Sequence, residues 1–148
     1  MLGEVAQHLT VLTLGVADIG RARAFYVDGL GWEVAYEDGD VVFVRLGHGC
    51  LLALWGGDDL AADAGRDLTR GSGSLALAKN VATDDEVDAL VELAVASGAA
   101  VVKHPQPAAF GGYHGYVTDP DGVLWEFAHN PGLSVDPDGR VRIEAVDP

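Results

Sequence analysis

The sequence predicts an α+β fold built from two tandem βαβββ modules, and three observations support this prediction. The same order of one strand, one helix and three strands is found twice, over about residues 9–56 and again over about residues 74–131. The strand-to-helix junctions Val16-Ala17-Asp18 and Val81-Ala82-Thr83 occupy equivalent places in the two halves. A segment rich in Gly, Asp and Ala, residues 57–73, links the modules, and residues 132–148 follow as a tail. Since one four-stranded sheet would leave a face uncovered, the halves are expected to curl around a shared concavity.

The elements of the first module follow from side-chain periodicity and capping residues. Residues 9–16 are apolar and rich in β-branched side chains, which predicts a strand. Asp18 is a favourable N-cap for a helix over residues 19–28, where apolar residues recur at helical spacing, and Gly29 is the expected C-cap. Three further strands are predicted, over residues 32–37, 41–46 and 50–55.

The second module repeats this order with a stronger helix signal. A strand over residues 74–81 leads to Thr83-Asp84-Asp85-Glu86, a capping box that begins a helix ending at Gly98. The remaining segments are a short strand over residues 100–103, a Pro-containing loop over 104–112, strands over 113–117 and 123–128, and a peripheral hairpin over 134–143.

The charge balance restricts the class of partner. The 148 residues carry a formal net charge of -14, yet 49% are hydrophobic and only 22% are charged, so a packed core is expected. Nucleic acid is an unsuitable partner because phosphate binding needs clustered Lys and Arg. No apolar run approaches the length of a membrane span and no targeting segment is evident, so a cytoplasmic protein is expected. The acidity either keeps the protein soluble or attracts a cationic ligand.

Three motifs give the chain a family resemblance. The first module contains Leu14-Gly15-Val16-Ala17-Asp18-Ile19, followed by Ala24-Phe25-Tyr26 and Leu30-Gly31-Trp32. The second contains Gly111-Gly112-Tyr113 with Gly115-Tyr116, and then Asp119-Pro120-Asp121-Gly122-Val123-Leu124-Trp125-Glu126. Over about residues 9–131 the chain resembles the vicinal oxygen chelate superfamily, also called the glyoxalase/bleomycin resistance protein/dioxygenase superfamily. The resemblance implies paired modules that form a U-shaped half-barrel of mixed sheets around a cleft, commonly as a homodimer.

In metal-dependent members of this superfamily, side chains from the first, fourth, fifth and eighth strands bind a divalent ion. Here the first three positions fall at or near Val11, Leu52 and Ser74, none of which is a usual ligand, and only Glu126 remains. One carboxylate is a poor site for an ion, and Cys50, the single cysteine, excludes a cysteine-rich zinc site. No metal cofactor is therefore expected. The alternative is an unorthodox Zn, Ni, Mn or Fe site made by Glu126 with His114.

The candidate catalytic residues are His114 and Glu126. Glu126 lies on a strand with apolar neighbours on both faces, so its carboxylate must protonate, meet a donor or face a cation. It is either a hydrogen-bonded part of the fold or an anchor for a ligand in the cleft. His114 is the best candidate for proton transfer, although a strand histidine is often structural. The candidate ligand-binding residues are Glu126 and the aromatic side chains Trp32, Trp55, Phe110, Tyr113 and Tyr116.

These observations favour a protein that binds a small molecule in its cleft, such as a drug or natural product that it sequesters. The missing metal positions and the acidic composition both support this reading. The alternative is an enzyme that uses an unorthodox site with Glu126. In that case a glyoxalase-type lyase or isomerase is favoured over a ring-cleaving dioxygenase, whose iron needs two histidines and a carboxylate.

Overall fold

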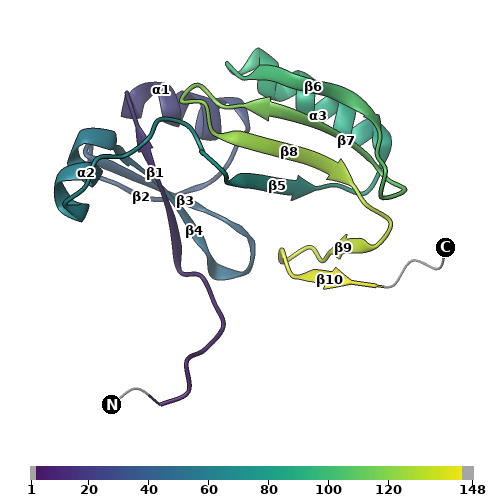
Figure 1. Ribbon diagram of the computed structural model, residues 1–148, viewed down its shortest axis with the longest axis horizontal. Helices are drawn as coiled ribbons and strands as arrows, with labels where there is room; N and C mark the ends of the chain where they lie inside the picture. The colour runs from purple at the N-terminus through teal and green to yellow at the C-terminus, as the bar shows by residue number, and fades with distance from the viewer. Residues whose placement is uncertain (1–2, 145–148) are drawn as a thin grey trace.

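The computed structural model describes residues 3–144 and confirms the α+β class, with two four-stranded mixed sheets that do not close into a barrel. The strand orders are β1-β4-β3-β2 and β5-β8-β7-β6, so the two sheets have the same topology. In each sheet the first and fourth strands of the module pair in parallel, and the other pairs are antiparallel. Figure 1 shows the two sheets beside each other, with α3 lying across one face of the second sheet.

The first module contains β1 (Val11–Val16), α1 (Ile19–Arg23), β2 (Val34–Glu37), β3 (Val41–Arg45) and β4 (Leu51–Gly56). The carboxylate of Asp18 accepts a hydrogen bond from the amide of Arg21 at 2.8 Å, which confirms the predicted N-cap. The helix continues beyond α1 as a π-helix, η1 (Ala24–Gly29), with a hydrogen bond from the Leu30 amide to the Phe25 carbonyl. The left-handed glycine that follows is Gly31, with φ 75°, rather than the predicted Gly29.

The second module contains β5 (Ala76–Asn80), α3 (Asp84–Ala96), β6 (Ala100–Pro107), β7 (Tyr113–Thr118) and β8 (Leu124–His129). The capping box at the start of α3 is confirmed, with the hydroxyl of Thr83 and the carboxylate of Glu86 each accepting from a backbone amide. The prediction that β6 ends at Lys103 was wrong. β6 is an edge strand, so its unpaired side tolerates Pro105 and Pro107, and two register shifts against β7 accommodate the irregular backbone.

The segment between the modules contains a helix that the sequence analysis missed, α2 (Gly57–Ala64). No side chain caps its N-terminus, and Gly, Asp and Ala dominate its composition, so no start signal marked it. Leu60 and Leu68 approach β1 at Gly15, where an added Cβ would lie 3.3 Å and 3.6 Å from their methyl groups. The connection is thus folded onto the first sheet.

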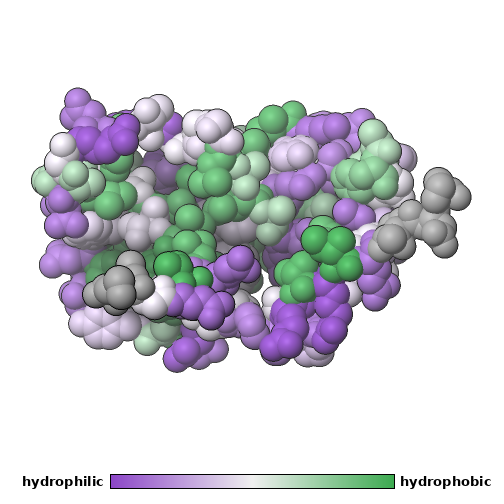
Figure 2. Space-filling view, turned by 60° about the horizontal axis from the view of Figure 1, so that its bottom comes forward, coloured by the Kyte–Doolittle hydropathy of each residue, from purple (hydrophilic) through white to green (hydrophobic). Residues whose placement is uncertain are grey.

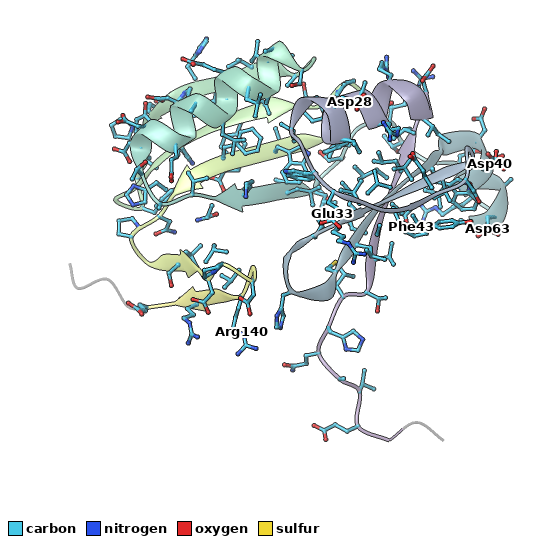
Figure 3. All side chains as sticks on the ribbon, turned by 180° about the vertical axis from the view of Figure 1, so that it is seen from behind. Asp28, Glu33, Asp40, Phe43, Asp63 and Arg140 are labelled. Atoms are coloured by element: carbon cyan, nitrogen blue, oxygen red, sulfur yellow. The ribbon has the colours of Figure 1, made fainter. Side chains whose placement is uncertain are left out.

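The predicted C-terminal hairpin is present as β9 (Leu133–Val135) and β10 (Val141–Ile143). Its turn returns to the first module, where the amide of His48 donates to the carbonyl of Asp138 at 2.8 Å. His48 lies in a short 3-10 turn, η2 (Gly47–Gly49), between β3 and β4. Figure 3 shows Arg140 of the hairpin beside this turn. The last four residues of the predicted tail, 145–148, lie outside the described residues.

One core extends through both modules. It contains Tyr26 from the first module and Trp125 from the second, and their rings lie 6.1 Å apart. The hydroxyl of Tyr26 donates to the buried carboxylate of Asp119 at 2.6 Å, so polar contacts also cross the junction. Within residues 3–144, no helix has the length and apolar character needed to cross a membrane.

Candidate functional site

The most concentrated set of polar side chains on the second sheet surrounds Glu126. Tyr116 of β7 pairs directly with Glu126 of β8, and His114 lies two residues before Tyr116 on the same face of β7. The Nδ1 atom of His114 lies 2.6 Å from Oε2 of Glu126. The hydroxyl of Tyr116 donates to the same oxygen at 3.0 Å. Adjacent antiparallel strands thus bring a carboxylate, an imidazole and a phenol into one hydrogen-bonded group.

Lys103 completes this group from β6, and the sequence analysis did not predict it. The residue pairs with Tyr116, and its Nζ atom lies 3.3 Å from Nε2 of His114. The sequence offers one feature that could have drawn attention to this residue: Lys79 and Lys103 are the only lysines in the chain. The predicted strand contains Lys103, but the register shift between Val101 and Lys103 concealed the pairing of Lys103 with Tyr116.

The two neighbours of His114 define its tautomer. A carboxylate only accepts hydrogen bonds, and an ammonium group only donates them. A neutral imidazole with its proton on Nδ1 therefore satisfies Glu126 and Lys103 together. Both hydrogen bonds that Glu126 accepts from side chains in residues 3–144 end on Oε2. Among the described residues, no side chain donates to Oε1.

Phe110 borders the same group from the loop between β6 and β7. Its ring centroid lies 5.2 Å from that of His114 in an edge-on arrangement, and 45% of the residue is exposed. The loop is a tight turn closed by a hydrogen bond from the Ala108 amide to the Gly112 carbonyl, with Gly111 at φ 89°. We call Lys103, Phe110, His114, Tyr116 and Glu126 the β7–β8 cluster.

Burial and charge both act on the phenol of Tyr116. Burial raises the pKa of Tyr116 above its ordinary value, and the hydrogen bond to Glu126 and the negative charge of that carboxylate raise it further. The side chain of His114 is 11% exposed, whereas that of Glu126 is 23% exposed. The cluster therefore combines an enclosed imidazole with a carboxylate that solvent and solutes can reach.

The structure places three predicted ligand-binding residues away from the β7–β8 cluster. Tyr113 points to the helix side of the sheet, where its hydroxyl donates to Asp88 of α3 at 2.7 Å. Trp55 lies in β4 of the first sheet, paired with Gly15 and Val41. Trp32 lies between the modules, with its ring 5.6 Å from both Tyr26 and Trp125. Of the predicted site residues, Phe110, His114, Tyr116 and Glu126 lie together.

The strand register locates the positions equivalent to Glu126 and corrects two sequence assignments. β4 has the same place in the first sheet as β8 has in the second. The parallel pairing begins at Val11–Leu51 in the first sheet and at Ala76–Leu124 in the second. Two residues further along, Glu126 of β8 therefore corresponds to Ala53 of β4. The predicted fourth-strand position, Leu52, points into the core and is 0% exposed. Ser74 precedes β5, and the residue that corresponds to Val11 is Ala76.

The metal centre of the metal-dependent relatives does not fit these residues. The side chains that would accompany Glu126 are aliphatic, at Val11, Ala53 and Ala76. Among residues 3–144, no group of three or more His, Cys, Asp or Glu side chains is arranged to hold a metal ion. The nearest imidazole, that of His114, already occupies both ring nitrogens with protein partners.

Comparison with known proteins agrees with this fold. The family model described as Glyoxalase/Bleomycin resistance protein/Dioxygenase superfamily matches residues 7–127. The chain therefore belongs to this superfamily, as its motifs indicate. The comparison with curated proteins finds no match.

Solved structures extend the comparison. The chain is similar to a glyoxalase-related enzyme from Fulvimarina pelagi, with 37% identity and a TM-score of 0.89 over 95% of this chain and 100% of that one. A lactoylglutathione lyase from Agrobacterium tumefaciens has 24% identity and a TM-score of 0.66, over 85% of this chain and 96% of that one. A superfamily enzyme from Burkholderia phytofirmans PsJN has 21% identity and a TM-score of 0.70, over 81% and 96%. The latter two similarities concern the fold alone.

Proposed function

We propose that this protein binds a small molecule at the β7–β8 cluster without the metal centre of the metal-dependent relatives. The observation that carries the proposal is the carboxylate of Glu126, which His114 and Tyr116 both orient through Oε2 while the side chain stays accessible. A hydrogen-bonded network fixes the direction of the group before a ligand arrives, which lowers the entropic cost of binding. The aliphatic residues at the other metal positions support the proposal that no metal takes part.

The chemistry of the cluster favours a guest with a hydrogen-bond donor or a cation beside a planar group. Oε1 of Glu126 would accept from the donor, and the exposed ring of Phe110 would contact the planar part. A cationic guest would also be attracted by the net charge of -14. Cationic drugs and natural products are the ligand class to be tested first.

The test is a thermal-shift screen with a panel of cationic natural products, bleomycin among them. A compound at 100 times its Kd is expected to stabilise the protein by about 2.7 kcal/mol. Glu126→Gln should remove the response, and Asp63→Asn, which removes one carboxylate from α2, should retain it. No response from the wild-type protein across the panel, or an undiminished response in Glu126→Gln, would contradict the proposal.

A second candidate function is catalysis, and the similarity to a glyoxalase-related enzyme at 37% identity favours it. In this reading Glu126 and His114 act together in proton transfer, either alone or with Zn, Ni, Mn or Fe in an unorthodox site. A glyoxalase-type lyase or isomerase is preferred over a dioxygenase. Elemental analysis of the purified protein, repeated after incubation with Zn²⁺, Ni²⁺, Mn²⁺ and Fe²⁺, separates the two candidates. A stoichiometric, tightly held metal that is lost in Glu126→Gln would replace the first proposal with the second.

We also propose that the protein acts as a homodimer in the cytoplasm. Large apolar side chains are exposed on edge strands of both sheets, including Tyr36 at 57% and Val102 at 60%, and a second copy would cover them. Light scattering at micromolar concentration tests the assembly, and a monomeric mass would contradict it.

A further inference from the structure

Trp32 has no part in the β7–β8 cluster, but it lines a separate cavity between the two modules. This cavity is a wide hollow, open to solvent, with a volume of about 410 Å³, and it is lined by Gly31, Trp32, Glu33, Arg45, Leu46, Gly47 and Lys79. Figure 2 shows a gap beside the C-terminal hairpin, whose residues are not among those that line this cavity, and Figure 3 shows Glu33 between the first sheet and β5. The volume is in the range of cavities that hold small organic ligands. We call it the junction cavity.

The side chains that line the junction cavity carry a net positive charge, whereas the protein as a whole is strongly negative. The chain has a net charge of -14, yet two of the three charged side chains around this cavity are cationic. Arg45 donates from Nε to Oε1 of Glu33 at 3.1 Å, so these two charges balance each other. Lys79 makes no ion pair with another residue among 3–144. Lys79 is exposed to solvent, so its positive charge is accessible to a ligand in this cavity.

The wall beside these charges is a rigid aromatic surface. Trp32 is half-buried, and its ring packs between those of Tyr26 and Trp125. A planar group that enters the cavity would meet an indole whose orientation the core already fixes, so little side-chain freedom is lost on binding. The neighbouring residue Gly31 has φ 75° and no side chain to narrow the entrance.

We infer that the junction cavity binds a small planar carboxylate, with its anion on Lys79 and its planar part against Trp32. Glu33 competes with such a ligand for Arg45, and it also repels the anion. Binding is therefore governed by one lysine, one tryptophan and one opposing glutamate. The inference concerns a site separate from the β7–β8 cluster and does not depend on the proposed function.

Benzoate is a suitable probe. Benzyl alcohol and benzylamine serve as control compounds of similar size, one neutral and one cationic. Isothermal titration calorimetry on the full chain should show benzoate binding at least tenfold tighter than either match. Lys79→Gln should weaken benzoate binding at least tenfold, and Glu33→Gln should strengthen it severalfold because Arg45 is released. The matched control is Arg66→Gln, which removes one positive charge from a residue outside the cavity lining and should bind benzoate like the wild-type protein.

Several outcomes would overturn the inference. These are the absence of benzoate binding, equal affinity for benzyl alcohol, or a Lys79→Gln variant that binds as the wild type does. Trp32→Phe tests the aromatic wall, and circular dichroism would establish that the variant is folded, because Trp32 also contacts the core. Glu126→Gln should leave benzoate binding unchanged. A loss of binding in Glu126→Gln with none in Lys79→Gln would assign the probe to the β7–β8 cluster instead.

Discussion

The hydroxyl of Tyr26 is the polar centre of the junction between the modules. It donates to Oδ2 of Asp119 at 2.6 Å and accepts from Nε1 of Trp125 at 2.9 Å. Tyr26 is fully buried and Asp119 is 4% exposed, so neither has water as an alternative partner. Burial raises the pKa of Asp119 above its ordinary value, while the hydrogen bond from Tyr26 lowers it in part.

Tyr26→Phe is expected to destabilise the fold by about 2–5 kcal/mol at neutral pH, because it leaves a buried carboxylate and a buried indole N–H without this partner. The lost hydrogen bond favours the charged carboxylate, so the pKa of Asp119 rises further in the variant. The extra cost is therefore fully present above the raised folded-state pKa of the variant, and it is lost as the pH falls below that value. Urea unfolding at pH 7 and pH 3 measures both effects. An equal loss at the two pH values would contradict the role assigned to the Asp119 charge.

A second residue-scale prediction concerns the phenol of the β7–β8 cluster. Glu126→Gln should lower the pKa of Tyr116, because it removes the negative charge beside the phenol and replaces a charged acceptor with a neutral amide oxygen. Burial, the largest cause, persists, so the value should stay above 10.0. NMR titration of the tyrosine ring carbons measures the shift. Asp88→Asn is the matched control, since it should lower the pKa of Tyr113 from about 12 and leave that of Tyr116 unchanged.

Among the elements, the C-terminal hairpin depends on a contact between two glycines. A Cβ added to Gly47 would lie 2.7 Å from the Cα of Gly139, a separation that folded proteins do not show. The backbone of Gly47 is in an ordinary region, so the absence of a side chain is required by the close approach and not by φ. The hairpin thus closes onto the first module only where both positions are glycine.

Gly47→Ala is expected to detach the hairpin from the first module while both sheets stay folded. The amide of His48, which donates to Asp138, should then exchange with solvent at least tenfold faster in hydrogen-exchange NMR. Gly3→Ala, where an added Cβ meets nothing within 4 Å, should leave this exchange rate unchanged. Unchanged protection of His48 in Gly47→Ala would show that the contact does not hold the hairpin.

The helices and strands also show which short-range sequence patterns are sufficient to predict where an element begins and ends. The Asp18 N-cap and the capping box at Thr83 are short-range hydrogen-bond patterns, and both helices begin where these patterns predict. The helix α2 lacks such a pattern, and its residue Leu60 packs close to the first sheet at Gly15. The length of β6 likewise depends on its pairing with β7, which overrides the usual effect of Pro105 and Pro107.

At the scale of the whole molecule, one core joins two similar modules. Asp121 of the second module accepts hydrogen bonds at Oδ1 from the Ala17 amide at 2.8 Å and from Arg21 at 3.0 Å. Tyr26 and Trp32 pack on Trp125 across the same junction. Neither module could therefore separate without exposing aromatic side chains and breaking buried polar contacts.

The chain is accordingly expected to unfold in one cooperative transition. Tryptophan fluorescence reports on Trp32 and Trp125 at the junction and on Trp55 in the first sheet, and far-UV circular dichroism reports on both sheets, so the two urea curves should coincide. Asp121→Ala should lower the free energy of unfolding by about 1–3 kcal/mol, and the urea midpoint with it, because the Ala17 amide and the Arg21 side chain lose their acceptor. Arg21→Gln removes only the exposed donor and should cost less than 1 kcal/mol. Separate transitions for the two probes would show that the modules fold independently.

The sequence by itself determined the duplicated βαβββ order, the N-caps of α1 and α3 and the closing turn motif, because each depends on residues close together in the chain. Tertiary structure alone decided that Lys103, Phe110, His114, Tyr116 and Glu126 converge while Trp32, Trp55 and Tyr113 lie elsewhere. The physical reason is register. A shift of one residue in a strand moves a side chain to the opposite face, and only pairing across β6, β7 and β8 fixes that register.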